Sequence, residues 1–582
     1  MAGEEGSHSD NIFEIIIKYI IMSKIETIQL EPTISTNSYH VQPAGLVEEK
    51  KLALPLWREY QRILFRVAFL FFISLSIPNS VEWYRQLIAL DWTSLHYRDL
   101  YDIARFGSGI NFFGNTIFGN PLLGYANWVI TLGISIAGGL VWTFIVKKRG
   151  TERKEYNTLY YWLRVVVRYR AGIGIIGFGF TKLLPTQLPY PSLGILNTNF
   201  GDLTAQKIYW LSVGIVPWYE IFAGVVEVMA GALLFFRRTT TLGAILLFGA
   251  LADIVYVNFA YDGGVHVYSS YFVLLAAFLL VNDIPDIYRL LVQERYTVPL
   301  NYYPAFNRPW QKYARLTLKS ATIFLFLVVL FYLQVVNFLY DPYKQPAVAG
   351  VKNLRGNYAV TEFKINNQSI PYSPLDTLRW QEATFENWST LTFRVNKPTP
   401  LDLSNGGGDP QRDVNRTFEV SGVAGGQRVF HYYADEISKM LYLEDKYKAV
   451  PDRRNITAGA GGDGGTEINL NSPDNTQRKN LRRTNNPSRQ QESWIPQAAL
   501  ANVGDEVNKI APLAMTTRRI REYAKAPKNE ERNRMILNYE TTDGNRVILT
   551  GINEHKDSIY VVLDRINRNY SLKPSSLQAG KY

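Results

Sequence analysis

Two kinds of pattern divide the chain. Between residues 60 and 340 apolar side chains form long blocks, and on either side of this region polar residues prevail. A helix that crosses a bilayer needs about 20 mostly apolar residues. Seven segments meet this requirement, and we interpret them as membrane spans at about 60–80, 125–146, 160–184, 210–236, 240–261, 265–282 and 318–338.

The charges of the short connections predict how these spans are oriented. Lys and Arg concentrate after the second, fourth and sixth spans, in "KKRGTERK", "RR" and "NRPWQKYARLTLK". The connection after the third span has only Lys207, and the one after the fifth has no basic residue. Basic loops stay in the cytoplasm. We therefore expect a multi-pass protein of a bacterial inner membrane, with a cytoplasmic N-terminus and a periplasmic C-terminal domain.

Beyond the last span the pattern changes to alternation at period two, in runs such as "STLTFRVN", "RTFEVSGV" and "SIYVVLDRI". Such runs are typical of short strands, and "TTDGNR" is a hairpin turn signal. About eight strands in meander order predict a lipocalin-like up-and-down barrel, built from roughly 350–450 and 530–570. With the register open by one residue, alternation predicts inward side chains at Phe393, Phe418, Tyr432, Ile536 and Val561.

The fold class is therefore an α-helical membrane bundle followed by an all-β barrel domain. Residues 451–500, rich in Gly, Asn and Arg, are predicted to form a flexible insertion in the barrel domain. The expected regions are a cytoplasmic segment (1–57), two flanking spans with an extracytoplasmic loop (58–150), a four-helix core (151–295), a cytoplasmic connection with the last span (296–345) and the barrel domain (346–582).

Composition removes several classes of function. The chain has no cysteine, so disulfides and thiol chemistry are excluded, and its six histidines are scattered without ligand spacing. No metal site is predicted. The net charge of +11 and the arginines of the insertion raise the question of nucleic acid. No nucleic-acid-binding motif accompanies them, and we expect the lipid bilayer as a partner and no nucleic acid.

Ionisable residues inside the spans are the candidate chemistry. Each costs about 2.5–3.5 kcal/mol to insert and usually marks a partner or a function. Counting depth from the span ends places Glu227 beside Arg168 and Arg170, with Asp253 joining this inner layer and facing the bundle interior. The same count pairs Lys182 with Glu220 in an outer layer. Structural ion pairs, a polar cavity for an anion-bearing ligand, and proton or ion conduction all stay open.

Three stretches carry a resemblance to a known family: "RYRAGIGIIGFGFTKLLPTQLPYP", "EIFAGVVEVMAGALLFFRRTTTLGAILLFGALADIVYVNFAYD" and "HVYSSYFVLLAAFLLVNDIPDI". Over about residues 160–290 the sequence resembles the DoxX/DoxD family of small four-helix membrane proteins, in a large form with extra helices and an exported β domain. The resemblance implies a polar site at Lys182, Gln187, Glu220, Glu227, Asn258, Tyr261, Asp262, His266, Tyr268 and Ser270.

The function implied by this resemblance is an accessory or quinone- or lipid-ligand-binding subunit of a membrane redox complex, with quinone as the candidate cofactor. Two alternatives stay open. One is a non-enzymatic membrane anchor that presents the exported β domain to an envelope protein complex. The other is a small-anion transporter that uses the arginines of the third span. Whether the protein is an enzyme is not decided by the sequence.

Overall fold

The computed structural model describes residues 57–570 apart from 94, 96, 107–108, 111–120, 298–301, 341–343, 347, 400, 403–412, 447–493, 501–531 and 569. The predicted cytoplasmic segment and most of the predicted insertion therefore lie outside the described residues. Residues 494–500 of the insertion are described, and Trp494, Ile495 and Ala499 pack beside Tyr433.

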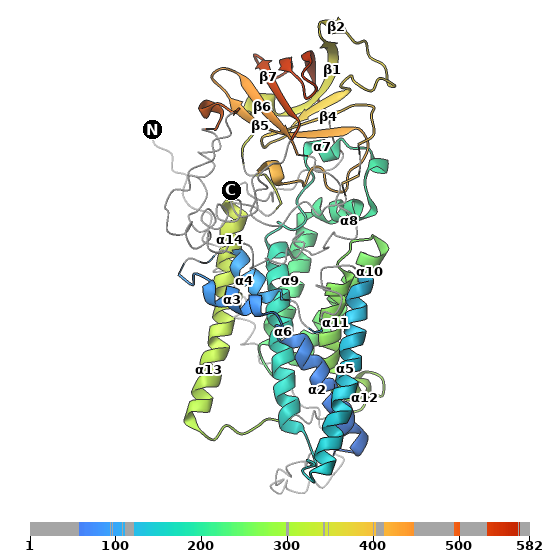
Figure 1. Ribbon diagram of the computed structural model, residues 1–582, viewed down its shortest axis with the longest axis vertical. Helices are drawn as coiled ribbons and strands as arrows, with labels where there is room; N and C mark the ends of the chain where they lie inside the picture. The colour runs from blue at the N-terminus through green and yellow to red at the C-terminus, as the bar shows by residue number, and fades with distance from the viewer. Residues whose placement is uncertain are drawn as a thin grey trace, which may run out of the picture. The chain divides into compact units, whose positions relative to one another are not determined.

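Helices form the first part of the described chain (Figure 1). Four of them are long and apolar enough to cross a membrane: Gly124–Lys148, Pro217–Leu234, Thr240–Ala260 and Pro309–Tyr340. The helices are α2 (Glu59–Ser76), α3 (Val81–Ala89), α4 (Tyr97–Ala104), α5 (Pro121–Lys148), α6 (Asn157–Leu183), α7 (Leu193–Leu196), α8 (Ala205–Gly214), α9 (Pro217–Leu234), α10 (Thr240–Ala260), α11 (His266–Leu280), α12 (Ile284–Leu291), α13 (Pro309–Ile323) and α14 (Leu330–Tyr340), the last two joined by a π-helical turn (Phe324–Val329).

One predicted span is broken. The segment predicted as one span over 210–236 is divided into α8 and α9, because Pro217 lacks an N–H group and favours the first turn of a new helix. Helix α11 lies within the predicted sixth span and is followed, after a bend of 76°, by α12; among the described residues this pair adds a fifth candidate if the two helices form one bent span. Helices α2 and α6 occupy the predicted first and third spans, but α6 carries four basic residues.

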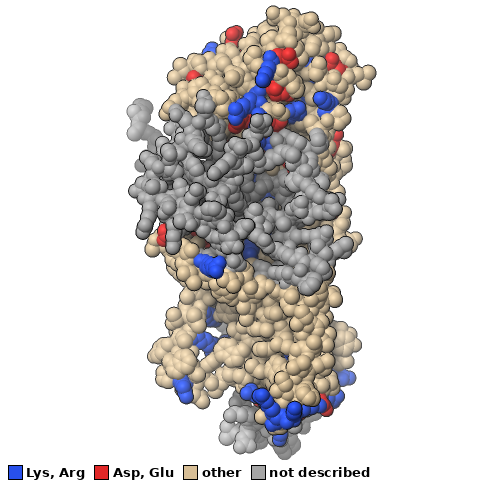
Figure 2. Space-filling model, in the orientation of Figure 1, with Lys and Arg blue, Asp and Glu red and all other residues tan. Residues whose placement is uncertain are grey.

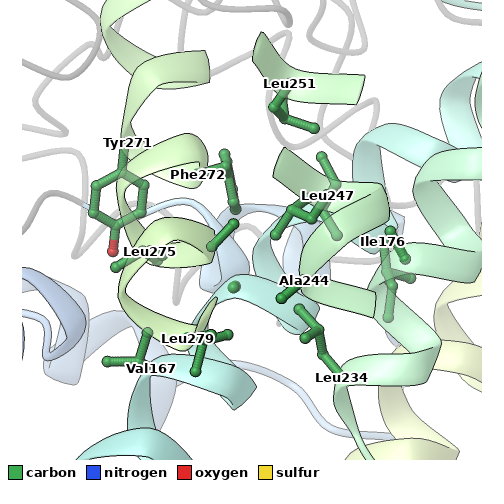
Figure 3. Close-up of a cluster of buried hydrophobic side chains, with 14 of the residues drawn as sticks. Val167, Ile176, Leu234, Ala244, Leu247, Leu251, Tyr271, Phe272, Leu275 and Leu279 are labelled. Carbon is green, nitrogen blue, oxygen red and sulfur yellow. The ribbon is translucent and has the colours of Figure 1, made fainter. Parts of the chain in front are cut away.

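Small residues bring α6 and α9 together. A Cβ atom on Gly172 would lie 3.0 Å from the carbonyl oxygen of Gly231, and one on Gly224 would lie 2.8 Å from that of Gly179. Such glycines allow helix backbones to approach closely, and they account for the packing of α6 on α9. The apolar core lies between α6, α9, α10 and α11 (Figure 3). Its labelled members are Val167, Ile176, Leu234, Ala244, Leu247, Leu251, Tyr271, Phe272, Leu275 and Leu279.

The C-terminal part is a closed antiparallel barrel of eight strands. Sheet neighbours follow chain order, β1 also pairs with β9, and the two-residue strand β2 adds only to the end of β1. The predicted barrel is thus confirmed. The strands are β1 (Gly356–Ile365), β2 (Gln368–Ser369), β3 (Glu382–Phe385), β4 (Thr390–Arg394), β5 (Gln427–Asp435), β6 (Met440–Asp445), β7 (Arg534–Glu540), β8 (Arg546–Ile552) and β9 (Ser558–Ile566).

Aliphatic and aromatic side chains together fill the barrel interior. The rings of Trp380 and Phe393 stack with centroids 3.8 Å apart, and the rings of Phe393 and Phe430 stack with centroids 5.6 Å apart. The predicted inward positions Phe393, Tyr432 and Val561 are confirmed, since all three belong to this core. The predicted "TTDGNR" turn joins β7 to β8, with Gly544 at φ 77°.

Two predictions about the barrel are wrong. Ile536 points outward and is 36% exposed, because Met535 and Leu537 take the inward positions of β7. The segment "RTFEVSGV" is not a strand, since the N–H groups of Val420 and Ser421 both turn back to the carbonyl of Thr417. Phe418 is therefore buried outside the barrel.

Candidate functional site

The predicted inner layer of charges does not form. Lys182 Nζ donates to both carboxylate oxygens of Glu227, at 2.7 and 2.8 Å, and Glu227 has no contact with Arg168 or Arg170. The reason is side-chain direction, because side chains on a helix tilt toward its N-terminus. Lys182 therefore reaches back into the bundle from the last turn of α6, to the level of Glu227 on the antiparallel α9.

The predicted outer pair is also wrong. Glu220 is fully buried, and its side chain tilts toward the start of α9, where Oε1 accepts from the N–H group of Leu188 at 2.9 Å. Its Oε2 is buried without a hydrogen-bond partner in the described part of the chain. Gln187 lies in the same connection and accepts from the Thr181 hydroxyl at 3.2 Å. These two contacts tie the loop after α6 to the first turn of α9 and to the end of α6.

The two arginines predicted in the inner layer have other partners. Arg170 is buried and donates to the hydroxyl of Tyr271 at 2.9 Å and to the carbonyl of Ala104. Its guanidinium also lies 3.9 Å from the ring centroid of Phe106. Arg168 donates to the hydroxyl of Thr240 at 3.1 Å. Arg170 thus fixes α6 to α11 and to the chain after α4, which is a structural role.

Asp253 does not face the bundle interior, contrary to the prediction. It is exposed, because Leu247, Leu251 and Asn258 occupy the buried face of α10 and Asp253 lies on the opposite face. Asn258 donates to the carbonyl of Ile254 at 2.7 Å within the same helix.

The remaining candidate residues lie near the loop between α10 and α11. Tyr261 stacks on Tyr209 with centroids 5.2 Å apart, and Asp262 is exposed at φ 53°. His266 is 3.2 Å from the hydroxyl of Tyr125 and stacks on Phe259. The same Tyr125 hydroxyl bonds Ser270 at 2.9 Å, and Tyr268 is buried against Phe178. The predicted site residues are therefore divided among several local networks.

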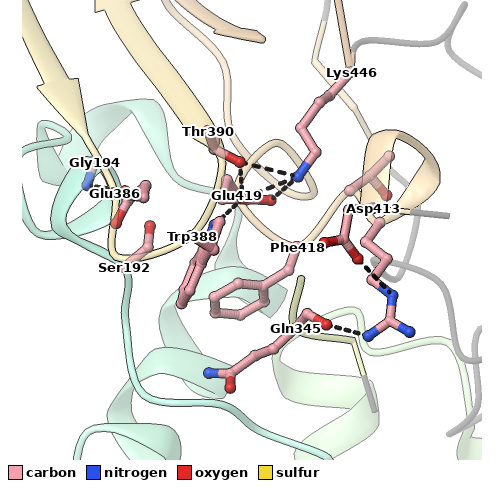
Figure 4. Close-up of polar contacts among 12 residues, drawn as sticks. Ser192, Gly194, Gln345, Glu386, Trp388, Thr390, Asp413, Phe418, Glu419 and Lys446 are labelled. Atoms are coloured by element: carbon pink, nitrogen blue, oxygen red, sulfur yellow. Dashed lines mark hydrogen bonds and ion pairs between the residues drawn. The ribbon is translucent and has the colours of Figure 1, made fainter. Parts of the chain in front are cut away.

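The structure instead reveals a buried polar junction between the bundle's outer segments and the barrel, which sequence reasoning missed (Figure 4). Glu386, after β3, accepts from the N–H groups of Leu193 at 2.9 Å and Gly194 at 2.6 Å, at the start of α7. Asn197 donates to Glu382 of β3 at 2.7 Å. The outer face of β3 and β4 is thus covered, and both strands are buried on both faces.

A fully buried ion pair stands at the centre of this junction. Lys446 Nζ lies 3.0 and 3.1 Å from the two carboxylate oxygens of Glu419, and both side chains are at most 1% exposed. The indole N–H of Trp388 and the hydroxyl of Thr390 also donate to Glu419. In the sequence, the residues of this junction could have been recognised only as charged and polar side chains within or beside otherwise apolar strand segments.

Helix α8 contributes a buried lysine to the same junction. Lys207 Nζ donates to the carbonyl of Phe418 at 2.6 Å and lies 4.5 Å from the centroid of its ring. Burial lowers the pKa of Lys207 to about 7, although the nearby carboxylates of Glu419 and Asp402 oppose this shift. Burial likewise raises the pKa of Glu386 to about 7, against the N–H donors of α7.

These two shifts predict a stability minimum near neutral pH. Glu386 binds its proton more tightly in the folded state, so stability should fall as pH rises from about 4.5 to about 7. Lys207 binds its proton more weakly in the folded state, so stability should rise from about 7 to about 10.5. Thermal unfolding of the full chain across this range measures both limbs. Glu386→Gln should flatten the acidic limb only, and Lys207→Met the alkaline limb only; a profile unchanged by either variant contradicts the assignment.

The junction has little room for a ligand. A cavity of about 30 Å³ lies between the α7 region and β3, β4 and β5, and Glu382, Thr392 and Gln427 are among its lining residues. This volume suits a water molecule and no organic cofactor. Within the described residues, no group of three or more His, Asp or Glu side chains is placed to hold a metal ion.

Comparison with known proteins identifies a partial relative. The chain is similar to the uncharacterized protein YwoB of Bacillus subtilis strain 168, with 34% identity over 94 residues. The match covers 15% of this chain and 61% of YwoB, so the chain spans less than two thirds of that relative. No protein-family model matches the chain, and no solved structure matches it. The described residues form four membrane-compatible helices and a closed barrel, and the DoxX resemblance stays a prediction.

Proposed function

We propose that this protein is a multi-pass anchor in the inner membrane. It holds a closed β-barrel at the periplasmic side of that membrane and presents the uncovered face of the barrel to an envelope protein. The observation that carries the proposal is the junction, where Glu386 of the barrel accepts two N–H groups of α7. Because the barrel is fixed through the outer face of β3 and β4, the outer face of its remaining strands is exposed in a defined orientation. In the proposed topology seven spans place the barrel outside the cytoplasm.

Two further observations support an anchor over a ligand-binding redox subunit. The intramembrane side chains of Glu227 and Arg170 already bind other groups of the same chain. The barrel interior is occupied by aliphatic and aromatic side chains, unlike the open cavity of a ligand-carrying barrel. The DoxX-like redox role with quinone, and anion transport, remain predictions that these observations do not favour.

The proposed topology predicts the behaviour of reporters. A reporter fused after Tyr582 should be active if it works outside the cytoplasm and silent if it works inside. A reporter in the basic "KKRGTERK" connection should behave in the opposite way. The reverse pattern at either position contradicts the topology.

Site-specific photocrosslinking in cells tests the anchor function. Ile536 and Ile552 are paired across β7 and β8, and both are exposed on the outer face of the barrel. A photoreactive residue at either position should give a discrete adduct with an envelope protein. At Val129, 69% exposed on α5, no such adduct should form. Absence of any adduct from β7–β8, together with stoichiometric quinone that is lost in Glu227→Gln, would overturn the proposal in favour of the redox role.

A further inference from the structure

Four basic side chains from three parts of the bundle lie close together: Arg168 of α6, Arg237 between α9 and α10, and Arg315 and Lys319 of α13. We call these four residues the basic cluster. Arg168 donates to the hydroxyl of Thr240, which donates to the carbonyl of Phe236 at 3.0 Å, and Lys319 Nζ lies 4.1 Å from the ring centroid of the same Phe236. Arg237 is the next residue after Phe236, and Arg315 lies one turn before Lys319 on α13. In the described ranges no carboxylate forms an ion pair with any of the four, whereas nearby Arg164 pairs with Asp283 at 3.5 Å. Four like charges without a counter-charge raise the energy of the folded chain.

Aromatic rings hold these cations in place without neutralising them. Lys319 Nζ lies 4.1 Å from the ring centroid of Phe236, and the guanidinium of Arg237 lies 4.4 Å from that of Tyr303. Cation–π contacts of this kind orient a cation and leave its charge in place. The Nε atom of Arg168 is buried and has no hydrogen-bond partner among the described residues. The basic cluster therefore has positive charge that no carboxylate of the described residues neutralises, and one hydrogen-bond donor without an acceptor among them.

The surroundings of the basic cluster are those of a membrane surface. Arg315 and Lys319 lie in the first part of the candidate span Pro309–Tyr340. Leu316 and Leu318 on the same helix are 62% and 69% exposed, and Phe236 is also exposed. Figure 2 shows basic side chains, with few acidic ones, among uncharged surface on the lower part of the molecule. An occupant must therefore be anionic at one end and apolar at the other.

We propose that the basic cluster binds the phosphate group of an anionic phospholipid, whose acyl chains lie on the exposed apolar side of α13. A phosphodiester supplies the missing negative charge and accepts hydrogen bonds from guanidinium groups. Free phosphate would share the headgroup chemistry but would leave Leu316 and Leu318 uncovered. Juxtamembrane basic groups of this kind attract anionic lipids. This inference does not depend on the anchor proposal, because the cluster is separate from the barrel junction.

Lipid binding to the purified full chain in detergent tests the inference. The probes are short-chain phosphatidylglycerol, short-chain phosphatidylcholine and inorganic phosphate. The test variant is the double substitution Arg315→Gln and Lys319→Gln, which changes a helix with no buried residue. The control is Arg149→Gln with Lys312→Gln, which removes the same charges from two exposed positions outside the cluster.

The wild-type chain should bind phosphatidylglycerol saturably and in preference to phosphatidylcholine. The test variant should bind it about tenfold or more weakly, because two of four cations are removed, and the control should bind as the wild type does. Equal loss in both variants, or none in the test variant, overturns the site. Inorganic phosphate that binds as tightly as the lipid, with the same dependence on the variants, overturns the lipid assignment.

Discussion

Glu419→Gln should lower the stability of the barrel junction by about 3–5 kcal/mol, the range measured when one partner of a buried ion pair is removed. The expectation follows from burial, since Lys446 is 0% exposed and Glu419 is its ion-pair partner. In this variant the ammonium keeps a neutral amide oxygen and the Thr390 hydroxyl, at 3.4 Å, as acceptors among the described residues, but it loses its negative counter-charge. Water cannot reach the charge, so the desolvation cost is not compensated.

Hydrogen exchange of β4 and β5 amides in the full chain measures this loss as the free energy of local opening. The double variant Glu419→Gln with Lys446→Met should recover much of it, because replacing a whole buried pair is far less costly than breaking it. Asp564→Asn is the matched control. Its partner Arg546 is 66% exposed, and such surface pairs contribute about 1 kcal/mol or less. A loss from Glu419→Gln as small as that of the control would show that the pair is not buried in solution.

Local patterns predicted the elements of this fold well. The alternation that placed Phe393, Tyr432 and Val561 in the barrel core depends only on neighbours in sequence and on the pleat of a strand. The apolar blocks similarly located the helices. The strand predicted around Phe418 failed because Thr417 and Ser421 offer the chain a local turn, which alternation does not register.

The charged contacts were harder to predict, because they depend on long-range geometry. Counting residues from span ends ignored the tilt of side chains along a helix, so Glu227 was assigned to the wrong partner. Asp253 was placed inside because hydropathy does not show which face of α10 is buried. The Glu419–Lys446 pair joins residues 27 positions apart, across a turn that the sequence presented as a strand.

Breaking the Lys182–Glu227 pair should be the most damaging single change within the bundle, and its two halves should differ. Glu227 is 2% exposed and has no route to water, whereas the Lys182 side chain is 13% exposed and begins in the last turn of α6. Lys182→Gln strands a buried carboxylate, and we expect a loss of about 3–5 kcal/mol. Glu227→Gln removes the counter-charge of a lysine that starts in the last turn of α6 and whose flexible side chain can turn toward water at the helix end, so its loss should be smaller.

Thermal unfolding of the full chain in detergent gives the order of the two variants. The double variant Lys182→Gln with Glu227→Gln should be more stable than Lys182→Gln alone, since no charge is then stranded. Glu59→Gln, which breaks the exposed pair with Lys147, should change stability by about 1 kcal/mol or less. If instead both single variants unfold as the wild type does, the pair contributes nothing to the bundle. Glu227 would then be free to serve a ligand or a proton, and the structural assignment of this pair would be wrong.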